Sequence, residues 1–269
     1  MITPRPFISA ESVTEGAEAV VYSNVSVVNV SFEELLLPED IAPAALQSYH
    51  VDFWLAQVNN GGCAQFFENG GRDERVIQHV TDGLTAMGAD RFLDVWERSL
   101  AVMRDLGPDL QPDNVFGSGA LQEAMSPLDD EFYRLAAEGE LTELNAAWLL
   151  SLPDLDRVPR AIIEQHLADI VARVPNLAER QAEAAAWREA HMPEYERNIR
   201  ALCSAQGIEL HSVNAGDPTF VFGGAATLAW FYSSSDGLQA MVIDGSDAVA
   251  VDGESHKELA RVPAWLPAS

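Results

Sequence analysis

The feature that most constrains the fold is a change of residue pattern near residue 207. Between residues 36 and 206, apolar residues recur mostly at helical spacing, as they do between Phe92 and Met103 after the potential N-cap Asp90. From Gly207 onward, short β-like runs are separated by Gly, Asp, Pro and Ser; these runs are 208–213, 219–222, 227–232, 238–243 and 248–251. The sequence therefore predicts an α+β protein, with a mainly helical domain over about 36–206 and a small antiparallel β-sheet from the C-terminal part.

The N-terminal region contains a further predicted strand. Residues 19–32, AVVYSNVSVVNVSF, are rich in valine and alternate in part between apolar and polar residues. Short strands need partners to be stable, so we expect this segment to join the C-terminal sheet and bring the two chain ends together. The expected division is a helical domain at 36–140, a helical extension at 141–206, and a small β region made of 207–269 plus 19–32.

The chain is strongly acidic, and the acidity is uneven. Its 269 residues include 42 acidic and 16 basic side chains, a formal net charge of −26. Residues 36–140 hold 19 acidic and 6 basic residues, whereas 151–200 carry a net charge of only −2. Such a charge repels phosphates, which argues against direct binding to nucleic acid.

The same sequence indicates a cytoplasmic protein. No apolar run reaches the roughly 18 residues that span a bilayer, and the first ten residues lack the pattern of a secretory signal. Two cysteines, Cys63 and Cys203, are too few for a disulfide framework. We therefore expect a cytoplasmic location and no membrane partner.

The most specific sequence signal is the segment WLAQVNNGGCAQFFEN, which runs from Trp54 to Asn69. Two glycines permit the positive φ values that reverse a chain in few residues, and asparagine favours helix ends. These properties predict a helix corner, with contact to a ligand or partner as the alternative. The motif residues are Trp54, Asn59, Asn60, Gly61, Gly62, Gln65, Phe66 and Phe67. Among them, we expect Gln65 to bond loop backbone and the three aromatic residues to form a hydrophobic clasp.

This segment resembles the hallmark of a bacterial DNA-mimic-protein-like family of unknown function, a helical domain with the motif VNNGGxxQ[YF]F, here Val58 to Phe67. Residues 128–133, LDDEFY, are similar to the closing L-D-x-x-[FY]-[FY] of that family, and the resemblance spans roughly residues 40–135. Cys63 departs from the pattern, because the family more often has Phe there.

The resemblance and the charge together imply a non-enzymatic acidic binding module. Such a module would occupy the basic DNA-binding surface of a partner, for example a transcription factor or a nucleoid protein, and a homodimer is compatible with it. The candidate contacts are Asp105, Asp109, Asp113, Asp129, Asp130 and Glu131.

Catalytic and metal-binding patterns are weak. The six histidines are scattered and form no H-x-x-x-H or H-E-x-x-H pattern. A His50–Cys63 pair is conceivable, but nearby Asp52 and Glu68 oppose the electropositive setting that a nucleophilic cysteine needs. We expect no enzymatic activity, no cofactor and no metal site.

Two alternatives stay open. The acidity could serve solubility or adaptation to a salty cytoplasm. The chain could also be a small-ligand binder or an enzyme with a site between the helical and β parts, around Trp230, Tyr232 and His211.

Overall fold

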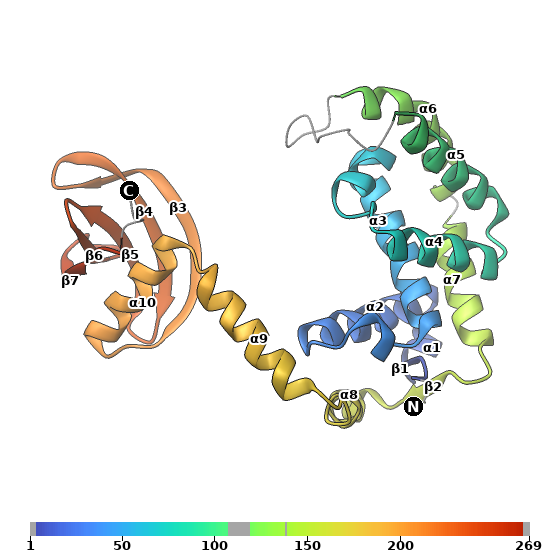
Figure 1. The fold of residues 1–269 in the computed structure, drawn as a ribbon, viewed down its shortest axis with the longest axis horizontal. Helices are drawn as coiled ribbons and strands as arrows, with labels where there is room; N and C mark the ends of the chain where they lie inside the picture. The colour runs from blue at the N-terminus through green and yellow to red at the C-terminus, as the bar shows by residue number, and fades with distance from the viewer. Residues whose placement is uncertain (1–3, 107–118, 138, 266–269) are drawn as a thin grey trace. The chain divides into compact units, whose positions relative to one another are not determined.

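A computed structural model describes residues 4–106, 119–137 and 139–265 of the chain (Figure 1). The chain divides into two compact units, residues 1–180 and 181–269. Helices dominate the first unit, and the second contains a five-stranded antiparallel sheet. The predicted α+β class is confirmed. The boundaries predicted at 140 and 206 do not coincide with this division.

The first unit is a set of helices arranged around one long helix. Its elements are β1 (Phe7–Ser9), α1 (Ser12–Glu15), α2 (Ala17–Glu33), η1 (Pro38–Asp40), α3 (Pro43–Glu68), α4 (Glu74–Ala86), α5 (Asp90–Leu106), α6 (Ala120–Ala136), α7 (Glu140–Ser151), β2 (Asp156–Val158), η2 (Arg160–Ile162) and α8 (Ile163–Val171). Helix α9 (Leu177–Ala190) crosses the division between the units.

Helix α3 takes part in both main cores of this unit. Its first half packs with α2 and α8 through residues such as Leu46, Val28 and Leu167. Its second half packs with α4, α5 and α6 in a larger core that contains Trp54 and Trp96. The local sequence explains the ends of these helices: Pro43 suits the first turn of α3, and the Asp73 carboxylate caps α4 by accepting from Arg75 N at 2.8 Å.

The predicted N-terminal strand is wrong, because residues 19–32 lie within helix α2. The buried side chains of this helix repeat with helical rather than alternating spacing; they are Val20, Val21, Ser23, Asn24, Val27, Val28 and Ser31. Valine disfavours helix by only about 0.5 kcal/mol per residue, and burial of this face against α3 and α7 outweighs that preference. The N-terminal strand is instead β1, which pairs in parallel with β2, Phe7 opposite Asp156.

The second unit is a β-meander with one helix packed against it. It contains α10 (Glu194–Gln206), β3 (Leu210–Phe222), β4 (Ala225–Ser234), β5 (Gly237–Asp244), β6 (Asp247–Asp252) and β7 (Glu258–Pro263), in the sheet order β3-β4-β5-β6-β7. Leu202 and Cys203 of α10 pack against Tyr232 and Met241 of the sheet. Most of the predicted run 208–213 and all of 219–222 belong to one long strand, β3, and none of the described N-terminal residues joins this sheet.

Candidate partner-binding surface

The V-N-N-G-G motif lies at an interruption within α3. The backbone leaves helical geometry at Gly61 (φ −161°, ψ 24°) and at Gly62 (φ 83°, ψ 175°), and the helix then continues to Glu68. A Cβ at Gly62 would lie 2.6 Å from the Asp129 carboxylate, in addition to the strain of a positive φ. At Gly61 a Cβ would lie 1.9 Å from Gln65 Oε1. Glycine is therefore required at position 62 by both conformation and space.

Helix α6 supplies hydrogen-bond partners for the interrupted backbone. Asp129 Oδ1 accepts from Cys63 N at 2.7 Å, and the Tyr133 hydroxyl donates to Val58 O at 2.8 Å. In an uninterrupted helix, Val58 O would accept from the N–H of Gly62, whose backbone is not helical here. The closing L-D-D-E-F-Y segment thus holds the V-N-N-G-G corner in place.

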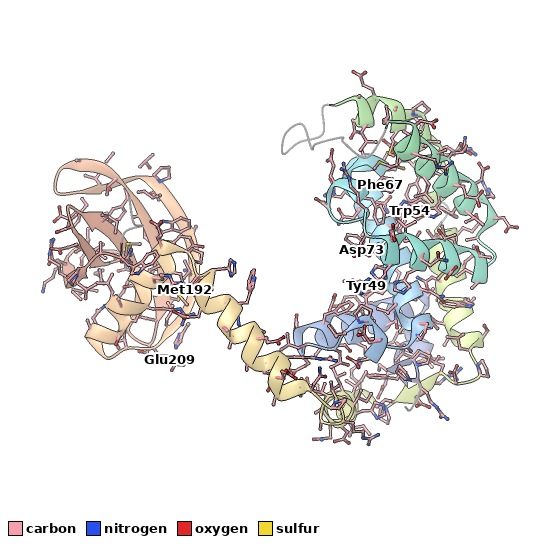
Figure 2. All side chains as sticks on the ribbon, viewed as in Figure 1. Tyr49, Trp54, Phe67, Asp73, Met192 and Glu209 are labelled. Carbon is pink, nitrogen blue, oxygen red and sulfur yellow. The ribbon has the colours of Figure 1, made fainter. Side chains whose placement is uncertain are left out.

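The aromatic residues of the motif form the centre of the larger core. Trp54, Phe66 and Phe67 are buried, and Figure 2 shows Trp54 and Phe67 on α3. The Phe67 ring stacks on Trp96 with centroids 5.8 Å apart, and Trp54 meets Trp96 edge-on at 5.5 Å. Such pairs add stability beyond the area that they bury.

The amides beside the corner bond to one another. Gln65 Nε2 donates to Gln57 Oε1 at 3.0 Å, and Asn69 Nδ2 donates to the same oxygen at 2.7 Å. Gln65 therefore bonds a side chain rather than the loop backbone. Asn59 and Asn60 are exposed.

The candidate acidic contacts do not share one environment. Asp105, near the end of α5, and Asp130, on α6, are exposed. Glu131 is half-buried and ion-paired with Arg98 of α5. Asp129 is buried at the α3 interruption, where it does not present its charge to a partner's surface. Asp109 and Asp113 lie outside the described residues.

Helix α5 carries an acidic row that the sequence reasoning missed. Asp90, Asp94, Glu97 and Asp105 are all exposed, and their spacings of 4, 3 and 8 residues place them on one side of the helix. That spacing is readable in the sequence and could have identified the row.

Two of the three arginines of α5, Arg91 and Arg98, pair with acidic side chains, whereas Arg104 is exposed near the end of the helix. Arg98 pairs with Asp94 at 3.0 Å as well as with Glu131, and Arg91 pairs with Glu140 of α7 at 3.1 Å. The hydrogen bond from Arg98 lowers the pKa of the Glu131 carboxyl and keeps it ionised. By contrast, within the described ranges, Glu97, Asp105 and Asp130 form no ion pair with arginine.

Cys63 and His50, the conceivable catalytic pair, both lie in buried, packed environments. Cys63 lies in the aromatic core, where burial and the neighbouring Asp129 raise the pKa of its thiol to about 12. His50 is buried and stacks on His79 of α4, with ring centroids 4.9 Å apart. Burial lowers the pKa of the His50 imidazole to about 4. The thiol is therefore protonated and the imidazole neutral at pH 7.

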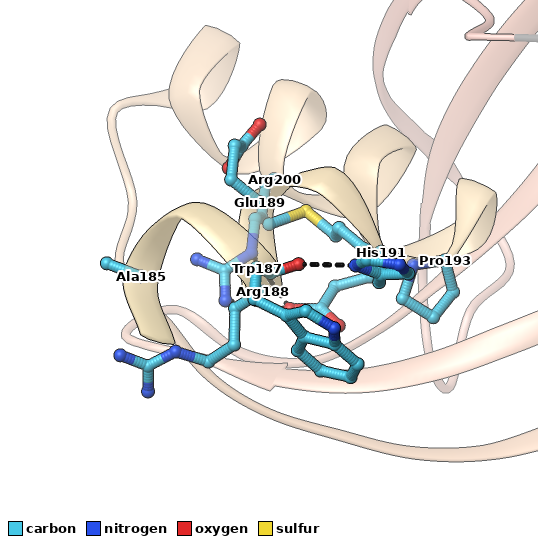
Figure 3. Close-up of a pocket in the computed structure, with 9 residues that line it drawn as sticks. Ala185, Trp187, Arg188, Glu189, His191, Pro193 and Arg200 are labelled. Carbon is cyan, nitrogen blue, oxygen red and sulfur yellow. Dashed lines mark hydrogen bonds and ion pairs between the residues drawn. The ribbon is translucent and has the colours of Figure 1, made fainter. Parts of the chain in front are cut away.

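The second unit contains a surface hollow at the corner between α9 and α10 (Figure 3). Its volume is about 390 Å³, and one side is formed by Trp187 stacked on His191 with centroids 4.4 Å apart. The residues suggested for a ligand site lie elsewhere in this unit. Trp230 stacks on Tyr195 of α10, Tyr232 is buried with its hydroxyl donating to Gln239 Oε1 at 2.7 Å, and His211 is exposed on β3.

The helical corner, its aromatic core and the α6 contacts all lie within residues 39–152, which match the model of the family described as DMP19-like protein. The expected resemblance is confirmed over these residues, which are less than half of the chain. Among curated proteins and among solved structures, nothing matches the chain.

Among the described residues, no helix combines the length and apolar character required to cross a membrane. Within the same ranges, no three His, Cys, Asp or Glu side chains are grouped as ligands of one metal ion.

Proposed function

We propose that the DMP19-like region is a non-enzymatic binding module that occupies the basic DNA-binding surface of a partner protein. The observation that carries this proposal is the coincidence of the family match with the acidity. Residues 39–152 contain 20 acidic residues and 6 arginines, a net charge of −14. DNA-binding proteins bind phosphates through lysine and arginine, so an acidic surface competes for the same groups.

The α5 row supplies part of the required charge pattern. Its four carboxylates span 15 residues, which is roughly 22 Å at the rise of an α-helix. Their mean spacing of roughly 7 Å is about twice the axial distance between phosphates on one DNA strand. Mimicry therefore needs additional acids from the adjacent helix α6, where Glu123 and Asp130 are exposed.

The test is capture of partners by the immobilised full chain from a nuclease-treated lysate at low salt. The proposal expects the retained proteins to be DNA-binding proteins that duplex DNA displaces. A variant that removes three exposed carboxylates, Glu97→Gln, Asp105→Asn and Asp130→Asn, should release them at lower salt. The matched control removes three exposed carboxylates from the second unit, Glu209→Gln, Asp236→Asn and Glu254→Gln, and should retain them.

General acidity is the competing explanation, and one observation favours it. Residues 181–269, which lie outside the family match, contain 12 acidic and 5 basic residues. If the charge only serves solubility or salt adaptation, the two triple variants should behave alike, and duplex DNA should displace nothing. Either result would remove the support for a DNA-mimic surface.

A further inference from the structure

Helices α2, α3 and α7 pack against one another (Figure 1), and each carries a fully buried polar side chain that faces this packing. Asn24 of α2, Ser48 of α3 and Asn145 of α7 are each at most 1% exposed. Asn24 Nδ2 donates to Ala45 O at 3.0 Å, and Asn145 Nδ2 donates to Ser48 O at 3.1 Å. Both amides are thus fixed to the backbone of α3.

These contacts place the three side chains at one junction. Ala45 and Ser48 are three residues apart on α3, so their carbonyls lie on one face, roughly 4.5 Å apart along the axis. Helices α2 and α7 also contact each other, since Val20 and Val21 pack with Ala146 and Leu149. The contact lies beside Asn24 and Asn145 in each helix.

One polar atom of each side chain is unsatisfied. Asn24 Oδ1, Ser48 Oγ and Asn145 Oδ1 are fully buried and have no hydrogen-bond partner among the described residues. A buried polar atom without a partner destabilises the folded state, so three of them on helices that pack together point to a bound molecule. The two amide oxygens require donors, and the hydroxyl can donate a hydrogen bond.

We propose that a water molecule binds at this junction and bridges Asn24, Ser48 and Asn145. Its two hydrogens bond to the two amide oxygens, and its own oxygen accepts from the Ser48 hydroxyl. Three partners are typical of buried structural water. The water ties α2, which lies outside the matched residues 39–152, to two helices of the DMP19-like region.

The same oxygens could bind a monovalent cation, but the surrounding charges oppose it. A buried cation needs a compensating carboxylate. Among the described residues, Asp129 is the one fully buried carboxylate, and it is engaged at the α3 interruption. Asp52, one turn after Ser48 on α3, is partly exposed, and burial raises the pKa of its carboxyl, which disfavours its charged form. A neutral ligand therefore fits the junction better.

The direction in which one substitution changes stability tests the proposal. In Ser48→Ala, loss of a hydroxyl that bonds to water should raise the unfolding equilibrium constant roughly five-fold. If that hydroxyl has no partner, its removal should instead lower the constant, and this result would overturn the proposal. Ser99→Ala is the matched control, because Ser99 is equally buried and its Oγ donates to Val95 O at 2.8 Å.

A crystal structure of the unaltered full chain at about 1.5 Å resolution gives a second test that does not depend on a variant. The expected result is one water within about 3 Å of all three oxygens. Direct hydrogen bonds between the three side chains would contradict the proposal. So would a melting temperature that changes between sodium, potassium and choline chloride at equal ionic strength, because that dependence indicates a cation.

Discussion

The carboxylate of Asp129 accepts a hydrogen bond from the backbone N–H of Cys63 at 2.7 Å, across 66 positions of sequence. This bond joins the two most specific motifs of the chain, V-N-N-G-G on α3 and L-D-D-E-F-Y on α6. It also gives one acidic residue of the second motif a structural role, whereas its neighbour Asp130 is exposed to solvent.

Asp129→Ala should lower the free energy of unfolding by about 2–3 kcal/mol, because it leaves the Cys63 N–H buried without a partner and removes a charged acceptor. Urea unfolding followed by circular dichroism measures this change. The matched variant Asp130→Ala should shift stability by less than about 0.5 kcal/mol, since that side chain is exposed. Equal effects of the two substitutions would show that the bond does not hold the corner.

Gly62→Ala should destabilise the protein by more than about 2 kcal/mol, because a Cβ there combines a positive φ with a 2.6 Å approach to the Asp129 carboxylate. Gly88→Ala is the control for conformation alone. Gly88 has a φ of 65° and open space around it, so the cost should be about 1 kcal/mol. Thermal unfolding of the two variants compares these costs, and a larger loss for Gly88→Ala would contradict the steric argument.

Tyr133→Phe should cost about 1 kcal/mol, the usual contribution of a hydrogen bond, because Val58 O loses the donated hydroxyl. If the Tyr133 hydrogen bond and the Asp129 hydrogen bond stabilise the same corner, the two substitutions should not be additive. The Tyr133→Phe, Asp129→Ala double variant should then lose less unfolding free energy than the two single variants lose together. Additive losses in a double-mutant cycle would indicate that the two contacts stabilise α3 independently.

The buried His50 should make stability depend on pH. Its pKa is lowered from an ordinary value of 6.5 to about 4 by burial, so the unfolded chain binds this proton more readily than the folded chain does. The contribution of neutral His50 to the free energy of unfolding is therefore fully present above pH 6.5, and it is lost as the pH falls toward 4. The loss amounts to roughly 3 kcal/mol.

A comparison of variants isolates this dependence from that of the carboxylates. Unfolding free energies at about pH 7 and about pH 4.5 should differ less in His50→Gln than in the unaltered chain. His211→Gln, at an exposed position, is the matched control. A pH dependence that His50→Gln does not reduce would show that the imidazole titrates normally.

The sequence was sufficient to predict elements in which one periodicity dominates. Helix α5 begins at the expected Asp90, and the short runs after Gly207 form the expected antiparallel sheet. Helix α2 was predicted as a strand because its valines favour β structure, while its burial pattern is helical. Only packing against α3 and α7, which is tertiary information, decides between these two interpretations.

Tertiary packing also decides which acidic residues of the chain reach the surface. Asp129 and Asp130 are adjacent acids, and net charge alone does not distinguish them. The spacing of Met125, Leu128, Asp129 and Phe132 nevertheless places position 129 on the buried face of α6, and this signal is present in the sequence. By contrast, the pairing of Arg98 with Glu131 joins two helices and depends on how they pack.

Competition between the full chain and duplex DNA for one captured DNA-binding protein tests the central claim most directly. The affinity is measured at salt concentrations between about 50 and 200 mM. The proposed DNA-mimic surface predicts mutually exclusive binding, an affinity that falls steeply with salt, and a further loss in the Glu97, Asp105 and Asp130 triple variant but not in its matched control. Simultaneous binding of the chain and DNA to that protein would contradict the claim.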